Sequence, residues 1–165
     1  MKTKYYVIKV QGNYVADIDY NYSDTQACVK ATPKLELAKL MNQEMRVRWI
    51  TGLCMQLQID TDTIESESVM VESTVVDESE TQTFAVRFAN GVYLKELAPD
   101  GVHCTKNTLP DCQQLDHADL NGKQATETIV KLLKLMADTD ILPDELRGDF
   151  TIVPVKRDFT DVVKI

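Results

Sequence analysis

Two short turn signals, each flanked by strand-like runs, constrain the fold of this 165-residue chain. The first is Gly12-Asn13, which lies between residues 5–10 and 14–19. The second is Asn90-Gly91, which lies between residues 84–89 and 92–95. Glycine and asparagine tolerate the positive φ angles that tight hairpin turns require. The sequence therefore predicts two β-hairpins.

A helix pattern follows each hairpin. Thr32-Pro33 is typical of a helix start, and we expect this first helix to end near Glu44. Its apolar stripe comprises Leu37, Ala38, Leu40, Met41 and Met45. In the second helix Asn121 and Gln124 have the spacing of a capping box. The apolar stripe of that helix comprises Ala125, Ile129, Leu132, Leu133 and Met136.

The remaining strands are predicted from shorter patterns. Residues 46–51 and 53–59 are interpreted as strands separated at Gly52, because a helix continued to Leu57 would carry apolar residues around its whole circumference. Residues 27–31 predict a short third strand, and residues 144–146 a short helical turn. We expect the strand at residues 150–155 to lie near a sheet edge or to end at Pro154, because proline cannot donate to a ladder.

The order hairpin, loop, helix and strand thus occurs twice. We predict an α+β fold made of two similar β-hairpin-plus-helix units joined by antiparallel acidic strands, which an internal duplication would explain. Residues 1–60 form the first unit, residues 61–81 the acidic connecting segment and residues 82–165 the second unit. The two units could pack as one domain.

The net charge of the chain, −8, equals the charge of one central segment, residues 49–86. Residues 49–86 contain no lysine or arginine, whereas the whole chain has 26 acidic and 18 basic residues. Eight carboxylates lie in this segment: Asp60, Asp62, Glu65, Glu67, Glu72, Asp77, Glu78 and Glu80. They alternate with Thr, Val and Ile, which predicts strands with one wet face. This face could be a charged edge that prevents strand pairing, or a surface that binds a basic partner.

Composition narrows the class of protein. The chain is 44% hydrophobic and 27% charged, as ordinary globular proteins are, and it lacks the apolar run of about 20 residues that spans a bilayer. No signal-peptide pattern follows Met1, so we expect a cytoplasmic protein with reduced cysteines. A pI near 4.7 argues against direct binding to nucleic acid or to an anionic membrane.

Ligand-type residues gather in one loop, residues 103–117. His103, Cys104, Cys112 and His117 are weak candidates for a zinc site or a cysteine nucleophile. Adjacent histidine and cysteine suit one tetrahedral ion poorly, and no glycine elbow, P-loop or dinucleotide fingerprint is present. We therefore expect neither catalytic residues nor a cofactor. A small-molecule binder with an apolar pocket between the units, or a metal or enzyme site in this loop, is the alternative.

Residues 5–10 and 12–15, together with Ala31-Thr32-Pro33 and Leu37-Ala38, resemble small accessory proteins of phages of Gram-positive bacteria. The likeness covers about the first 45 residues. Some such phage proteins inhibit host defences, as anti-CRISPR proteins do, and acidic ones imitate DNA. The resemblance implies an inhibitor in the host cytoplasm and carries over no individual residue. The acidic segment itself leads to the hypothesis that its eight carboxylates occlude the basic groove of a host protein. Both a monomer and a homodimer are compatible with the sequence.

Overall fold

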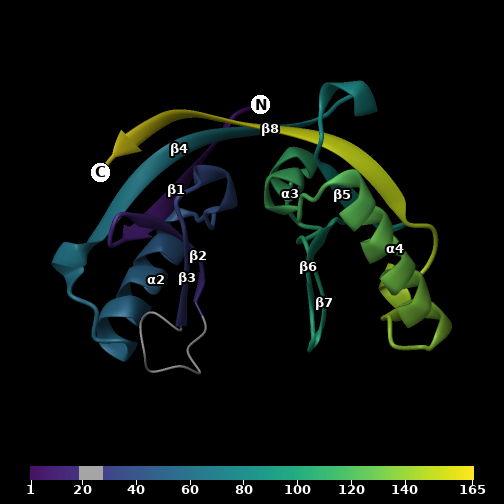
Figure 1. Cartoon of the computed structure of the whole chain (residues 1–165), viewed down its shortest axis with the longest axis horizontal. Helices are drawn as coiled ribbons and strands as arrows, with labels where there is room; N and C mark the ends of the chain where they lie inside the picture. Colours follow the sequence, from purple (N-terminus) through teal and green to yellow (C-terminus); the bar gives the residue numbers. More distant parts are fainter. Residues whose placement is uncertain (19–27) are drawn as a thin grey trace. The chain divides into compact units, whose positions relative to one another are not determined.

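The computed structural model describes residues 1–18 and 28–165, and it divides into two compact units (Figure 1). Unit 1 consists of Met1 and residues Glu72–Asp158, and unit 2 of residues Lys2–Val71 and Phe159–Ile165. The chain passes from unit 2 into unit 1 within strand β4 (Ile64–Val75) and returns within strand β8 (Thr151–Lys164). Helices and antiparallel strands are both present, which confirms the predicted α+β class.

The sheet of unit 2 has the strand order β3-β2-β1-β4-β8. Its remaining strands are β1 (Thr3–Val10), β2 (Asn13–Ile18) and β3 (Val29–Thr32). Strand β1 pairs antiparallel with both β2 and β4, and β2 pairs antiparallel with β3. The first predicted hairpin is therefore confirmed. Of the predicted third strand, residue 27 lies outside the described residues.

The first hairpin turn is one residue earlier than Gly12-Asn13. Val10 pairs with Asn13, so Gln11 and Gly12 are the two central residues, with φ angles of 53° and 82°. A turn with positive φ at both central positions matches the twist of the strands it joins. Glycine occupies the second of these positions, and Asn13 begins the returning strand.

The first predicted helix and the two strands after it are wrong. Residues Leu35–Leu37 form a short 3-10 helix, η1, and the α-helix of this unit is α2 (Gln43–Gln56). The side chain of Asn42 caps α2 by accepting a hydrogen bond from the Met45 N–H at 2.8 Å. Apolar residues do lie around the circumference of α2, but the helix leaves Val47 and Met55 exposed. A scattered apolar pattern therefore did not exclude a helix. A second 3-10 helix, η2 (Thr61–Thr63), precedes β4.

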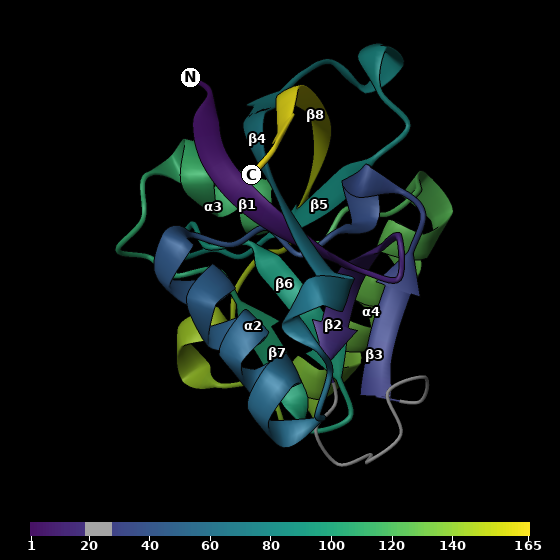
Figure 2. The ribbon, with the colours of Figure 1, turned by 90° about the vertical axis from the view of Figure 1, so that its left-hand side faces the viewer.

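Both faces of the unit 2 sheet are covered. Helix α2 packs on one face, where Ile8, Val15 and Leu53 are fully buried; Figure 2 shows α2 in front, near β2 and β3. On the other face the segment after η1 packs against Val7 and Val69. Alternate residues of a strand point to opposite faces, so β1 contributes to both cores.

Unit 1 contains a short sheet, a separate hairpin and two helices. Strand β5 (Phe84–Arg87) pairs antiparallel with β8, which also adjoins the end of β4. The other elements are 3-10 helix η3 (Glu78–Glu80), strands β6 (Leu94–Ala98) and β7 (Gly101–Cys104), helices α3 (Asp111–His117) and α4 (Lys123–Asp138), and 3-10 helix η4 (Asp144–Leu146). The predicted helical turn at η4 is confirmed. Residues 103–117, predicted as a loop, instead contain the end of β7 and all of α3.

The turn at Asn90-Gly91 is confirmed, with a different return strand. The Phe88 N–H donates to the Val92 carbonyl at 2.8 Å, and Gly91 adopts a φ of 93°. Strand β6 then pairs with β7 rather than continuing along β5. Between β5 and the returning chain, the described bridge is Arg87 with Tyr93.

The second predicted helix is confirmed as α4, and its capping box is wrong. Gly122 is the N-cap, while Asn121 forms a two-way main-chain bridge with Phe84. Leu133 is fully buried, as its place in the predicted stripe requires, but Ala125 and Leu132 are exposed. The apolar stripe of α4 is therefore wider than its buried face.

Pro154 lies inside β8, so the predicted edge or strand end at this residue is wrong. Pro154 pairs with Phe84 of β5, and on the β4 side its carbonyl accepts a hydrogen bond from the Val76 N–H at 3.1 Å. The Val155 N–H is directed to β5, where it bonds the Thr83 carbonyl. Proline's missing donor therefore falls on the β4 side, just where β4 ends. No ladder bond is lost there, which explains why proline is tolerated.

Candidate functional site

The eight carboxylates of residues 49–86 do not form one strand face. Asp60, Asp62, Glu65 and Glu67 belong to unit 2, and Glu72, Asp77, Glu78 and Glu80 belong to unit 1. Only three of the eight, Glu65, Glu67 and Glu72, lie on β4, and Glu72 is on the opposite strand face from the other two. The remaining five lie at η2 and η3. The predicted acidic sheet surface is corrected to three local groups.

Cations from distant parts of the sequence meet the acids of β4 in unit 2. Lys9 Nζ lies 3.6 Å from Glu67 Oε2, and the Tyr14 hydroxyl donates to Glu67 at 2.7 Å. Lys164 Nζ lies 3.3 Å from Glu65 Oε1. Burial, the hydrogen bond to Glu67 and the charge of Glu67 together raise the pKa of Tyr14 to about 12. A segment without basic residues thus obtains its counter-charges by folding.

Two acids of unit 1 have cationic partners as well. The N-terminal amine of Met1 lies 2.9 Å from Glu72 Oε1, and this hydrogen bond raises the pKa of the amine. Lys123 pairs with Glu78, which raises the pKa of the Lys123 ammonium. These pairs are solvent-exposed, and exposed ion pairs contribute little stability. The same carboxylates are therefore available for exchange with another cation.

Of the five acids at η2 and η3, Asp60, Asp77 and Glu80 accept main-chain hydrogen bonds from their own short helices. Asp60 accepts a hydrogen bond from the Asp62 N–H at 3.1 Å. Asp77 and Glu80 form a reciprocal capping box around η3. A capping box satisfies two main-chain donors and fixes the first turn. The carboxylates of η3 are thereby held on an ordered, exposed turn.

When charged residues are counted by unit, most of the net negative charge lies in unit 1. Residues 72–158 contain 16 acidic and 9 basic residues, whereas the rest of the chain contains 10 and 9. Unit 1 therefore carries −7 of the net charge of −8. Residues 138–149 alone hold five acids, Asp138, Asp140, Asp144, Glu145 and Asp149, all exposed. Arg147 pairs with Asp140 at 3.1 Å and with Asp144 at 3.4 Å. This second acidic run could be seen in the sequence. It was missed because it contains Arg147 and lies outside residues 49–86, the segment without lysine or arginine.

The four ligand-type residues of the 103–117 region are not brought together as a metal site. Cys104 packs against an apolar cluster, and burial raises the pKa of its thiol to about 11. His103 is exposed, with Nε2 3.1 Å from Asp100 Oδ1, and this contact lowers the pKa of the Asp100 carboxyl. Cys112 and His117 lie on α3. Across residues 1–18 and 28–165, no group of three or more His, Cys, Asp or Glu side chains could hold a metal ion.

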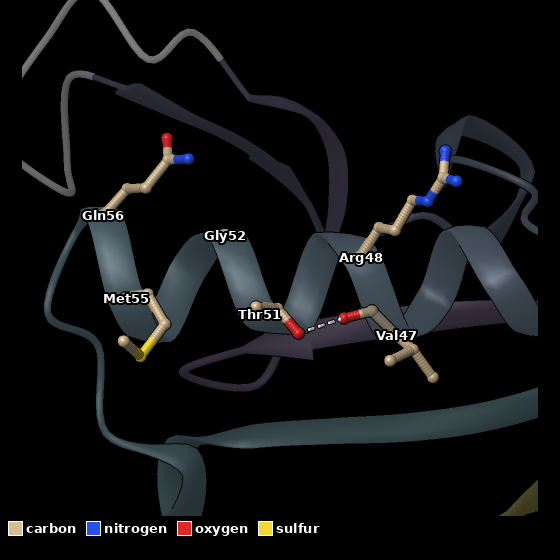
Figure 3. Close-up of a pocket in the computed structure, with 6 residues that line it drawn as sticks. All are labelled: Val47, Arg48, Thr51, Gly52, Met55 and Gln56. Carbon is tan, nitrogen blue, oxygen red and sulfur yellow. Dashed lines mark hydrogen bonds between the residues drawn. The ribbon is translucent and has the colours of Figure 1, made fainter.

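A small hollow lies along the exposed side of α2 in unit 2 (Figure 3). Its lining comes from one helix: Val47, Arg48, Thr51, Gly52, Met55 and Gln56. The Thr51 hydroxyl donates to the Val47 carbonyl at 2.8 Å, and Arg48 is bonded to Glu44 at 2.7 Å. Ligand pockets usually combine enclosure with several convergent polar groups. This hollow does not have that combination.

Every helix among the described residues is too short or too polar to span a bilayer. Comparisons with protein-family models, with curated proteins and with solved structures found no match to this chain.

Proposed function

We propose that this protein is a non-enzymatic acidic binding protein that inhibits a basic, nucleic-acid-handling protein of a bacterial host. One observation carries the proposal: unit 1 holds −7 of the net charge of −8. A concentrated field of one sign attracts a partner of the opposite sign and raises the association rate. The phage setting is supported by the resemblance of the first 45 residues to phage accessory proteins.

The mechanism is occlusion of a cationic groove by carboxylates that stand in for backbone phosphates. Within the segment of eight acids, the best-placed group is Asp77, Glu78 and Glu80, because all three are exposed on one turn. The capping box holds this turn before a partner arrives, which lowers the entropic cost of binding. Lys123 is a weak, exposed competitor for Glu78 that an arginine or lysine of the partner can replace.

Two variants of equal charge change test the proposal. D77N/E78Q/E80Q neutralises η3 in unit 1, and D60N/D62N/E65Q neutralises three acids in unit 2. Each tagged protein is used to capture partners from bacterial lysate, at low and moderate salt and with and without duplex DNA. We expect the unmodified chain to retain a basic nucleic-acid-binding protein that salt and DNA displace. The η3 variant should lose this protein, and the unit 2 variant should keep it.

Two results would overturn the proposal. Capture of no basic protein by the unmodified chain removes the proposed function. Equal loss in both variants shows that net charge, rather than the η3 turn, governs retention. Thermal unfolding followed by circular dichroism checks that both variants are folded before binding is compared.

We also propose that the two hairpin-plus-helix segments predicted from the sequence, residues 1–60 and 82–165, arose by internal duplication. In unit 2, Tyr6 and Met41 exchange main-chain hydrogen bonds of 2.8 and 2.9 Å just before the N-cap of α2. In unit 1, Phe84 and Asn121 exchange bonds of 2.8 and 3.0 Å just before the N-cap of α4. An experimentally determined structure should superpose the main chain around these two bridges and the helices that follow. Different helix directions relative to the bridges would refute common descent.

A further inference from the structure

Helix α4 has a second apolar stripe that its own unit does not cover. The core side of the helix carries Val130 and Leu133, which are buried. Leu132 and Leu135 are 45% and 58% exposed. With them, the exposed side carries residues spaced alternately by three and four positions: Ala125, Thr128, Leu132, Leu135 and Thr139. This spacing is that of the contact seam between two paired α-helices.

The polar members of the seam are compatible with helix contact. The Thr128 hydroxyl donates to the Gln124 carbonyl at 3.1 Å, and the Thr139 hydroxyl donates to the Leu135 carbonyl at 2.9 Å. Burying a hydroxyl is costly only when it lacks a hydrogen-bond partner. Both threonines can therefore be covered without leaving an unsatisfied donor.

The residues beside the seam complement those of a second, antiparallel copy. When Leu132 of one copy faces Leu135 of the other, heptad geometry brings Lys131 beside Asp138 of the second copy. Twofold symmetry repeats this ion pair, so two opposite-charge pairs form. On the other side of the seam, half-buried Ile129 meets Met136. A parallel pair would instead place Lys131 beside Met136 and form neither ion pair.

We propose that this protein forms a homodimer through antiparallel packing of α4 on α4 of a second copy, centred on Leu132 and Leu135. The occupant follows from charge and apolar complementarity, because Lys131 meets Asp138 and Ile129 meets Met136 under twofold symmetry. This inference does not depend on the proposed function, since it concerns a different surface and a different partner.

A charge-exchange cycle measured by sedimentation equilibrium tests the dimer and its direction. We expect the full chain to show a concentration-dependent monomer–dimer equilibrium. K131E places two like-charge pairs in the interface and should raise the dissociation constant about tenfold, as should D138K. The double variant K131E/D138K exchanges the signs and should restore the original constant. L135K places a charge in the seam and should abolish the dimer.

K134E is the matched control, because it makes the same charge change as K131E on the same helix but away from the seam. It should leave the dissociation constant within about twofold of the original. The proposal is overturned if the full chain is monomeric at every concentration, if K131E and K134E weaken association equally, or if the double variant fails to restore it. The double variant is expected to regain the association that each single variant loses. Unfolding of a single variant cannot produce that recovery.

Discussion

The main-chain conformation and the close packing at Gly148 favour glycine over any residue with a side chain. Its φ is 120°, and a Cβ built on it would lie 2.8 Å from the Cβ of Ala89. A side chain at Gly148 would therefore meet both an unfavourable main-chain conformation and a neighbouring side chain. Each effect alone costs about 1 to 2 kcal/mol.

We predict that Gly148→Ala lowers the free energy of unfolding by about 2 kcal/mol or more. The measurement is the urea midpoint at constant m-value. Gly122→Ala is the control, because Gly122 has a negative φ and no atom lies within 4 Å of the position that its Cβ would take. That change should cost under about 1 kcal/mol. Equal effects of the two substitutions would contradict the close approach of Gly148 to Ala89.

Tyr14 titrates far from the ordinary range of tyrosine. Its pKa is raised from 10.0 to about 12, first by burial and then by the hydrogen bond and charge of Glu67. Because the folded state binds this proton more tightly, the stabilisation is complete below pH 10 and is lost as the pH rises to about 12. The ordinary pKa values of lysine, near 10.4, and of tyrosine, near 10, also fall in this window, so the contribution of Tyr14 must be isolated by comparison with Tyr14→Phe.

We predict that the tyrosinate absorbance of the native chain, after subtraction of Tyr14→Phe, shows a transition near pH 12. Glu67→Gln removes the negative charge and should lower the pKa of Tyr14, though not to 10.0, because burial remains the larger cause. A transition at the ordinary tyrosine pKa in the unmodified chain would contradict this environment.

At the scale of elements, α2 is determined by its cap and its packing rather than by its own periodicity. Asn42 accepts from the Met45 N–H, Glu44 pairs with Arg48, and Leu53 is fully buried against the sheet. Helical residues with apolar groups on all sides give no clear periodic signal. The start of this helix was nevertheless present in the sequence as an asparagine at a typical N-cap position.

We predict that Asn42→Ala destabilises the protein by about 1 kcal/mol, because the Met45 N–H loses its acceptor. Asn42→Asp keeps an acceptor at the same position and adds a negative charge at the helix N-terminus, so it should be close to neutral or stabilising. Urea unfolding monitored by circular dichroism gives both values. If Asn42→Ala and Asn42→Asp were indistinguishable, the cap would not contribute.

At the scale of the whole molecule, the net negative charge belongs almost entirely to unit 1. Like charges within a compact unit repel one another and lower its stability, and salt screens that repulsion. Replacing exposed acids in unit 1 should therefore relieve more repulsion than replacing acids in unit 2, where 10 acidic residues face 9 basic ones.

We predict that E96Q/E145Q, in unit 1, raises stability at low salt by a few tenths of a kcal/mol per site. E36Q/D62N, in unit 2, makes the same change in net charge and should have a smaller effect. Melting temperatures of the three proteins, measured across a salt series, check this, and the difference should shrink as salt is added. Equal shifts for the two variants would show that the destabilising repulsion is not concentrated in unit 1.

Short-range features were predictable from the sequence itself. The turns near Gly12 and Gly91, the helix α4 and the turn η4 depend on residues within a few positions of one another, where positive φ and helical periodicity leave a direct signature. The α+β class follows from the same local patterns. The eight acids could likewise be named, because their excess is a property of composition.

Tertiary structure decided what those acids meet and which faces remain open. Glu65 pairs with Lys164, 99 positions away, and Glu67 with Lys9 of the adjacent strand β1 and with Tyr14 of β2, one strand further on. Such pairs depend on strand order and register, which no local pattern encodes. Residues 43–56 likewise form a helix because of their packing against the sheet. Leu132 remains exposed because no other described part of the chain packs over it. Local sequence sets backbone preference, whereas burial and charge pairing are set by residues that only folding brings together.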